Sequence, residues 1–173
     1  KLVGELLGHF PCRLLVATTQ WLAQHKQVEA AQIVEATDDE LSRASLLKTP
    51  QQVLALFEQP TEEVNTNYPQ SELCLTLDDV QDPGNLGTII RLADWFGIRH
   101  IYCSPNTADA FSPKVIQATM GAIARVNVHY TPLPDLIQSL GDTPIYGTFL
   151  DGDSIYKQSL SEHGLIVMGN EGN

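Results

Sequence analysis

The chain has 173 residues, of which 43% are hydrophobic and 18% are charged, a composition typical of globular proteins. Its formal net charge of −11 argues against a broad basic nucleic-acid-binding surface, so a contact with nucleic acid must be argued from a local site. No apolar run approaches the ~20 residues that cross a bilayer. The three cysteines and the scattered histidines show no metal-ligand spacing. We therefore expect a cytoplasmic protein without a membrane segment, a metal or a disulfide framework.

The N-terminal third of the chain alternates helix and strand patterns. Apolar residues recur at helical spacing over 1–10, and a short helix is predicted over 19–25. Thr37 and Glu40 have the spacing of a capping box, which predicts another helix start. Strands are expected at 13–18, 31–36 and 52–57. These elements predict a small α/β domain over residues 1–62.

A polar stretch without periodicity, 58–72, contains two prolines and indicates a domain boundary, with a linker over 63–71. A second α/β domain is predicted over 72–173. Its strands are expected at 73–77, 98–103, 125–130, 144–150 and 164–168, and its helices at 85–96, 113–122 and 134–140. Short apolar strands separated by helices predict a parallel sheet flanked by helices. We expect further chain after Asn173, including a helix that covers the sheet.

The stretch DPGNLGTIIRLADWFG, residues 82–97, predicts a turn followed by a helix. Leu86, Ile89, Ile90, Ala93 and Phe96 share one face, which we expect to pack on the sheet. Arg91 points the opposite way and is expected to lean over Gly87, which has no side chain to block it. Asn85 is placed to cap the helix or to face a ligand at the carboxyl edge of the sheet. An ordinary turn, an ordinary cap and a solvated arginine would produce the same pattern.

The stretch GNEGN, residues 169–173, follows an apolar strand. Gly169 and Gly172 tolerate unusual backbone angles, so the loop can present backbone groups to a ligand at close range. Glu171 between them would be a hydrogen-bond acceptor. A plain glycine turn is the alternative.

Three segments together resemble one family. DDVQDPGNLGTIIRLADWFG, FSPKVIQATMGA and IVMGNEG are similar to successive motifs of the SpoU/TrmH family, RNA ribose 2′-O-methyltransferases of the SPOUT superfamily. LSRASLLKTPQQVLALF (41–57) resembles the end of the RNA substrate-binding domain, with a ribosomal-protein-like α/β/α fold, found in many members. The resemblance implies a parallel sheet with a C-terminal trefoil knot, which is incomplete in this chain, since the third motif and the final helix would follow Asn173. Thr119 stands where serine is frequent.

The resemblance also implies the site. Arg91 matches the arginine that activates the ribose hydroxyl, Asn85 the asparagine that supports it, and Glu171 the acid of the second motif. It implies S-adenosylmethionine as cofactor, a homodimer with an active site across the interface, and rRNA or tRNA as partner. The expected cofactor-binding residues are Gly169, Asn170 and Gly172 in one loop and Thr148, Phe149 and Leu150 at a strand end.

The role of Arg91 stays open between two chemistries. An arginine normally remains protonated, so it would act as a base only with assistance from a substrate phosphate. Alternatively, it would stabilise the developing alkoxide electrostatically. Two other functions also stay open: a non-catalytic RNA-binding protein that retains the fold, and a small-molecule enzyme that uses the same edge of the sheet.

Overall fold

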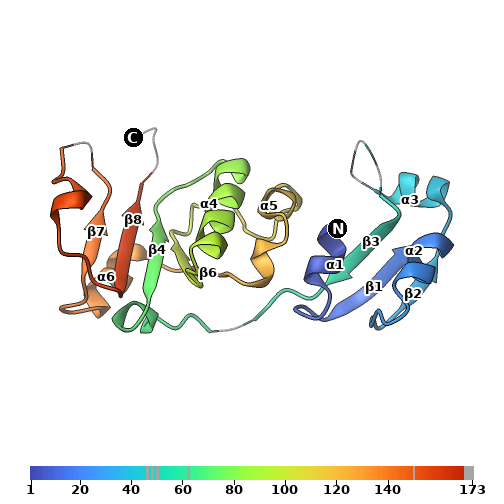
Figure 1. Ribbon diagram of the computed structural model, residues 1–173, viewed down its shortest axis with the longest axis horizontal. Coiled ribbons are helices and arrows are strands. Elements are labelled where there is room, and N and C mark those ends of the chain that lie inside the picture. Colours follow the sequence, from blue (N-terminus) through green and yellow to red (C-terminus); the bar gives the residue numbers. More distant parts are fainter. Residues whose placement is uncertain (46, 48, 50, 62, 150, 170–173) are drawn as a thin grey trace. The chain divides into compact units, whose positions relative to one another are not determined.

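The computed structural model describes residues 1–45, 47, 49, 51–61, 63–149 and 151–169. The chain folds into two compact units, residues 1–61 and residues 62–173, which divide within the polar stretch 58–72 (Figure 1). No helix in the described ranges combines the length and the apolar character needed to cross a membrane.

The first unit contains a three-stranded sheet of order β2-β1-β3, in which β1 runs parallel to β2 and antiparallel to β3. Its elements are α1 (Leu2–Leu6), β1 (Cys12–Ala17), α2 (Thr19–Gln24), β2 (Ile33–Glu35), α3 (Asp38–Ala44) and β3 (Val53–Phe57). Leu15 and Ala17 are fully buried in its core. The helix expected over 1–10 is shorter than predicted, because the chain leaves it before Gly8, which adopts a φ of +83°.

The capping box predicted at the start of α3 is present. Thr37 Oγ1 accepts a hydrogen bond from the Glu40 backbone N–H at 3.3 Å, and the Glu40 carboxylate accepts from the Thr37 backbone N–H at 2.9 Å. These hydrogen bonds favour the charged carboxylate and lower the pKa of Glu40.

The second unit contains five parallel strands in the order β6-β5-β4-β8-β7. Its elements are η1 (Tyr68–Gln70), β4 (Leu73–Leu77), α4 (Pro83–Trp95), β5 (His100–Cys103), α5 (Pro113–Thr119), η2 (Ala122–Ala124), β6 (Asn127–Tyr130), α6 (Leu133–Ser139), β7 (Ile145–Gly147), η3 (Ile155–Lys157) and β8 (Gly164–Met168). The predicted fold class, a parallel sheet flanked by helices, is confirmed. The trefoil knot stays a prediction.

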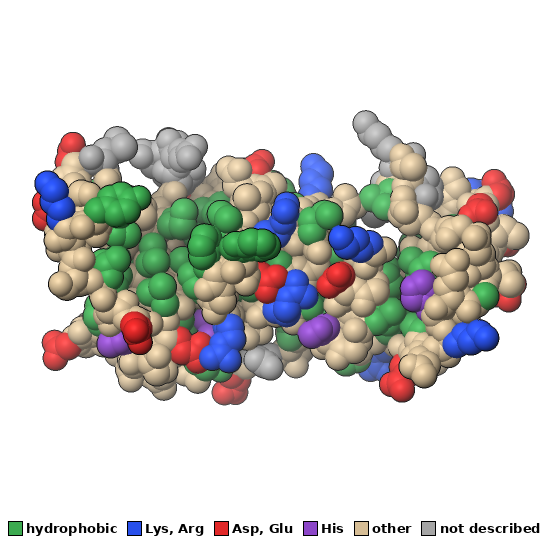
Figure 2. All heavy atoms as spheres, viewed as in Figure 1, with side chains coloured by type: hydrophobic (Ala, Val, Ile, Leu, Met, Phe, Trp, Pro, Cys, Tyr) green, Lys and Arg blue, Asp and Glu red, His purple; other side chains and the backbone are tan. Residues whose placement is uncertain are grey.

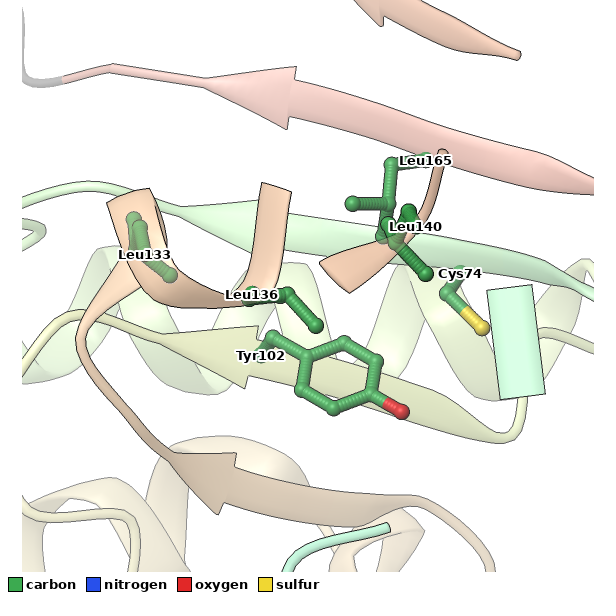
Figure 3. Packing of buried hydrophobic residues seen from close by; sticks show 6 residues of the cluster. All are labelled: Cys74, Tyr102, Leu133, Leu136, Leu140 and Leu165. Atoms are coloured by element: carbon green, nitrogen blue, oxygen red, sulfur yellow. The ribbon is translucent and has the colours of Figure 1, made fainter. Parts of the chain in front are cut away.

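Helices cover both faces of this sheet, with α4 in front of it and α6 behind it in Figure 1. Cys74, Tyr102 and Leu165 come from three neighbouring strands and pack against α6 (Figure 3). Side chains alternate along a strand, so Leu75 and Ile101 face the opposite side, toward α4. Strands buried on both faces are typical of parallel sheets, and their continuous apolar sequences allow such strands to be predicted.

One residue predicted for the buried face of α4 is exposed instead. Leu86, Ile90 and Ala93 are buried and Ile89 is half-buried, but Phe96 is 74% exposed. The helix ends at Trp95, and Phe96 follows with a φ of −92° and a ψ of 4°. Because Phe96 leaves the helical path, its position on the helical wheel does not describe its direction.

Aromatic side chains hold the residues before β4 against the sheet of the second unit. The Tyr68 ring stacks on His100 with ring centroids 3.6 Å apart, and His100 Nδ1 lies 3.1 Å from His129 Nε2. Tyr102 donates its hydroxyl hydrogen to the Asn65 carbonyl at 2.5 Å. Much of the stretch expected to be a linker therefore packs on the sheet near the amino ends of β5 and β6.

Candidate active site

The strands β4, β8 and β7 lie side by side and all end at the same edge of the sheet (Figure 1). Asp78, just after β4, donates its backbone N–H to the Met168 carbonyl at 2.9 Å. Thr148, just after β7, donates its backbone N–H to the Val167 carbonyl at 3.1 Å and its hydroxyl to the same oxygen at 3.0 Å. Ligands of open α/β sheets bind along this carboxyl edge.

The start of α4 differs from the prediction. The helix begins at Pro83 rather than Asn85, and Asp82 is its N-cap, whose Oδ1 accepts the Asn85 backbone N–H at 2.7 Å. A proline at the first helical position loses no hydrogen bond, so Pro83 lies inside the helix and not in a turn before it. The side chain of Asn85 does not cap the helix. It is exposed and makes no hydrogen bond with the described part of the chain.

A cavity of about 440 Å³ lies between the start of α4 and the end of β8. Thr88 and Ile89 close its helical side. The other residues that line it are Val80, Gln81, Asp82, Asn85, Met168 and Gly169. The structure thus brings together two residues predicted for the site, Asn85 and Gly169, from segments more than 80 positions apart.

The end of β7 lies beside the end of β8. Gly147 pairs with Val167, so β7 ends one residue before the end of β8. The phenyl ring of Phe149 lies across Gly147, where a Cβ atom would stand 2.1 Å from Phe149 Cε2, and 81% of Phe149 remains exposed. The predicted strand end therefore lies beside β8, whose last residue, Met168, lines the cavity, and the exposed ring of Phe149 follows it.

Arg91 is not part of the cavity wall. It is exposed and makes no hydrogen bond or ion pair with any described residue. Arg91 follows Asn85 by six residues, and with 3.6 residues per turn this places the two side chains about 120° apart around the helix. One copy of the second unit does not bring Arg91 and Asn85 to the same face of α4.

The expected role of Gly87 beside Arg91 is wrong. Gly87 is buried, and a Cβ atom at this position would lie 2.3 Å from Ala118 Cβ. Its missing side chain therefore makes room for α5 and leaves no special opening for the arginine.

Four residues predicted for the site lie outside the described residues: Leu150, Asn170, Glu171 and Gly172. Six further residues that line the cavity were not predicted for the site: Val80, Gln81, Asp82, Thr88, Ile89 and Met168. Gln81 and Thr88 were within or beside the quoted motif, but nothing in the pattern distinguished them from solvated positions. Over the described ranges, no group of three or more His, Cys, Asp and Glu side chains has the geometry of a metal site.

Comparison with known proteins assigns the family. Residues 72–173 match the SpoU rRNA Methylase family. A 23S rRNA (guanosine(2553)-2′-O)-methyltransferase, RlmP, of Bacillus subtilis is 34% identical over 139 residues, which are 79% of this chain and 54% of the relative. The human mitochondrial rRNA methyltransferase 3 is 29% identical over 155 residues, 81% of this chain and 36% of the relative.

Solved structures agree with this assignment. A protein ascribed to the TrmH family of RNA methyltransferases, from Porphyromonas gingivalis, superposes with a TM-score of 0.88 at 43% identity and covers 99% of this chain and 70% of its own. An AdoMet-bound rRNA methyltransferase from Sinorhizobium meliloti superposes with a TM-score of 0.80 at 30% identity, over 99% of this chain and 68% of its own. The chain spans about half or less of the length of these curated relatives. On the family match over 72–173 and these likenesses, the chain belongs to the SpoU/TrmH family.

Proposed function

We propose that the protein transfers a methyl group from S-adenosylmethionine to a ribose 2′-hydroxyl of RNA, either rRNA or tRNA. The observation that carries this proposal is the cavity that joins Asn85 of the first family motif to Gly169 of the second. Three of the proteins named above are rRNA methyltransferases, and one of these three has been solved with AdoMet bound. The non-catalytic alternative has no observation in its favour.

The residues at the ends of β7 and β8 fit this cofactor. A Cβ atom at Gly169 would meet nothing within 4 Å, so a ligand can approach the backbone there closely. Phe149 offers an exposed aromatic face for an adenine base, and Met168 offers an apolar wall. Together with Leu150 and the rest of the loop, Asn170 and Gly172, these residues would hold the cofactor. When bound, S-adenosylmethionine supplies an electrophilic methyl group.

The chain itself must orient the ribose and handle one proton. Asn85 has an unpaired side-chain amide at the cavity, which can bind the ribose hydroxyl and align its oxygen. Arg91 would stabilise the negative charge that develops on this oxygen, or accept its proton with help from a phosphate. Glu171 would serve as an acceptor on the other side of the site. No metal is required for this displacement.

We also propose a homodimer in which the partner supplies Arg91. One chain leaves Arg91 about 120° around α4 from Asn85, so a second copy is needed to bring an arginine to the cavity. On the outer side of α4, Leu92 is 51% exposed and Trp95 84%, and Phe96, which follows the helix, is 74% exposed. Exposed apolar side chains are visible on the face drawn in Figure 2. Clustered apolar residues of this kind mark interaction sites.

Residues 1–62 are proposed to bind the RNA substrate. The first unit has a cavity of about 530 Å³ lined by Glu35, Asp38 and Glu40, whose carboxylates would repel phosphate. A second cavity of about 540 Å³, beside α1 and the end of α2, includes Lys26 and His25 and no carboxylate. This second cavity is therefore the better candidate for an RNA contact.

The cytoplasmic location belongs to the same proposal. Cys12, Cys74 and Cys103 are buried free thiols, as in proteins of a reducing compartment.

The proposal is tested by incubating the protein with methyl-labelled S-adenosylmethionine and separate rRNA and tRNA transcripts. Labelled RNA is then digested with alkali, which cannot cleave beside a 2′-O-methyl group. Label in an alkali-resistant dinucleotide is expected. Label released in mononucleotides would indicate base methylation and contradict the proposal. RNA binding without cofactor binding in calorimetry would favour the non-catalytic alternative.

A further inference from the structure

Asp79, directly after β4, has a backbone conformation that few residues adopt. Its φ is +53°, in the left-handed region, where a residue with a side chain is strained unless its surroundings hold it. Aspartate tolerates this region better than most residues, because its short side chain bonds locally. A residue in this conformation must be held there by contacts with its surroundings.

Ser104, directly after β5, holds Asp79 through a reciprocal pair of hydrogen bonds. The Asp79 backbone N–H donates to Ser104 Oγ at 2.8 Å, and the Ser104 hydroxyl donates to Asp79 Oδ1 at 3.0 Å. Ser104 is only 6% exposed. Both bonds thus lie largely out of water, where losing one partner leaves the other unsatisfied. We call this pair the Asp79–Ser104 clasp.

The clasp is anchored to the sheet and to the next loop. The Ser104 backbone N–H donates to the Leu77 carbonyl at 2.9 Å, and Thr107 Oγ1 lies 3.2 Å from Ser104 Oγ. The Ala108 backbone N–H donates to the Val80 carbonyl at 3.0 Å. The loop after β5 is therefore fixed, and it fixes the chain on both sides of Asp79.

The segment that the clasp orients is one wall of the cavity. Val80, Gln81 and Asp82 follow Asp79 and all line the cavity. Asp82 then caps α4 through the backbone N–H of Asn85. The left-handed turn at Asp79 thus decides where the chain enters α4 and where the Asn85 amide stands relative to the end of β8.

We propose that Asp79 and Ser104 are positioning residues for methyl transfer, because their clasp holds residues 80–85 in the orientation that presents Asn85 to the ribose. This inference rests on the proposed function. The clasp joins the ends of β4 and β5, and β8 separates β4 from β7, so the clasp is remote from the strand end proposed to hold the adenine.

The test compares four variants of the purified protein. Ser104→Ala removes both clasp bonds, and Asp79→Ala removes the acceptor and keeps the strain. Asp79→Asn keeps an acceptor oxygen and tolerance of positive φ. Asp142→Ala removes an exposed carboxylate from the turn after α6 and serves as the matched control. We expect Ser104→Ala and Asp79→Ala to lower kcat about tenfold without changing the KM for S-adenosylmethionine, and Asp79→Asn and Asp142→Ala to stay within about twofold of the parent.

Amide hydrogen exchange provides a second readout that does not depend on methyl transfer. In Ser104→Ala, the amides of Ala108 and Asn85 are expected to exchange faster while those of β5 stay protected. A Ser104→Ala variant that retains the parent kcat, or unchanged exchange at both amides, overturns this inference alone. A parent protein that transfers no methyl group removes the proposed function and the inference with it.

Discussion

Gly87 of α4 lies directly against Ala118 of α5. A Cβ atom at Gly87 would stand 2.3 Å from the Ala118 Cβ and 3.0 Å from the Ala118 carbonyl carbon. The second distance involves backbone, which a rotamer change cannot move away. The two helices therefore approach so closely because one of them has no side chain at the contact, and this approach sets the position of α4 above the sheet.

Gly87→Ala is expected to destabilise the protein by about 1–3 kcal/mol, the usual cost of overpacking a well-packed contact. Alanine is the better helix former by about 0.5–1 kcal/mol, so the steric term must exceed this gain. Urea unfolding measures the difference. Gly4→Ala in α1 is the control, since a Cβ there meets nothing within 4 Å and should stabilise slightly. A Gly87→Ala protein at least as stable as the parent would show that α4 and α5 can accommodate the added Cβ without cost, and would contradict this expectation.

The centre of the sheet of the second unit was predictable because β4 and β5 are buried on both faces. Each of 73–77, 98–103, 125–130, 144–150 and 164–168 contains an observed strand, although three of these strands are shorter than predicted. Continuous apolar runs identify such strands without any knowledge of their neighbours. The strand predicted over 144–150 is too long, because β7 ends at Gly147. The chain then turns, and the Phe149 ring lies over Gly147.

The site was less predictable, because its geometry depends on neighbours that the sequence does not reveal. A helical wheel gives the angle of Gly87 but not the presence of Ala118, so its role was misassigned. Likewise, Asp82 and Asn85 both suit a helix N-cap, and only the structure shows that Asp82 takes it. The juxtaposition of Asn85 with Gly169 follows from the strand order, in which β8 lies beside β4.

Removing the cap of α4 should weaken both the fold and the site. Asp82→Ala deletes the oxygen that accepts the Asn85 backbone N–H at 2.7 Å and is expected to cost about 0.5–2 kcal/mol of unfolding free energy. Asp82→Asn retains an acceptor and should cost much less. Thermal or urea unfolding of both variants checks this expectation. Equal losses from alanine and asparagine would mean that charge, rather than capping, is what matters at Asp82.

The protein is expected to lose stability at alkaline pH. Burial raises the pKa of Cys74 to about 12, with a smaller contribution from the Glu72 charge, and burial alone raises the pKa of Cys103 to about 12. An unfolded thiol has a pKa of about 8.5. Between about pH 9 and 12 the unfolded state therefore binds fewer protons than the folded state, and the free energy of unfolding falls as pH rises.

Urea midpoints at about pH 8, 9 and 10 measure this fall. Tyr102 and Tyr130 also have pKa values raised by burial, so they contribute in the same direction at the upper end of the range. The Cys74→Ala/Cys103→Ala double variant should show a shallower decline than the parent. A parent whose midpoint is constant over this range would contradict the burial of the two thiols.

The outer side of α4 should carry the dimer contact. Trp95→Glu places a charge where Trp95 is 84% exposed in a single chain and is expected to shift the protein from dimer to monomer in sedimentation velocity. Tyr156→Glu is the control, because Tyr156 is 95% exposed and lies in η3, away from α4 in the sequence. A Trp95→Glu protein that sediments as the parent dimer would exclude this face as the interface.

Arg91 provides the most direct test of the chemistry. Arg91→Ala should lower kcat about 100-fold or more, the scale of losing one charge-stabilising group, while the Kd for S-adenosylmethionine in calorimetry stays within about threefold. Arg99→Ala is the matched control: it removes an exposed arginine just before β5, at the opposite edge of the sheet, where it pairs with Glu72 at 2.9 Å. An ion pair this exposed contributes at most about 1 kcal/mol, so the control should fold and retain kcat.

The proposed dimer allows a further test, in which two inactive variants are mixed. If the partner supplies Arg91, mixing inactive Arg91→Ala subunits with inactive Asn85→Ala subunits should restore activity, because some mixed dimers then contain one intact site. Restoration approaching one quarter of the parent kcat is the order expected when half of the dimers are mixed and each has one working site of two. No restoration, with mixed dimers demonstrated by mass, would mean that Arg91 and Asn85 act within the same chain despite their separation around α4.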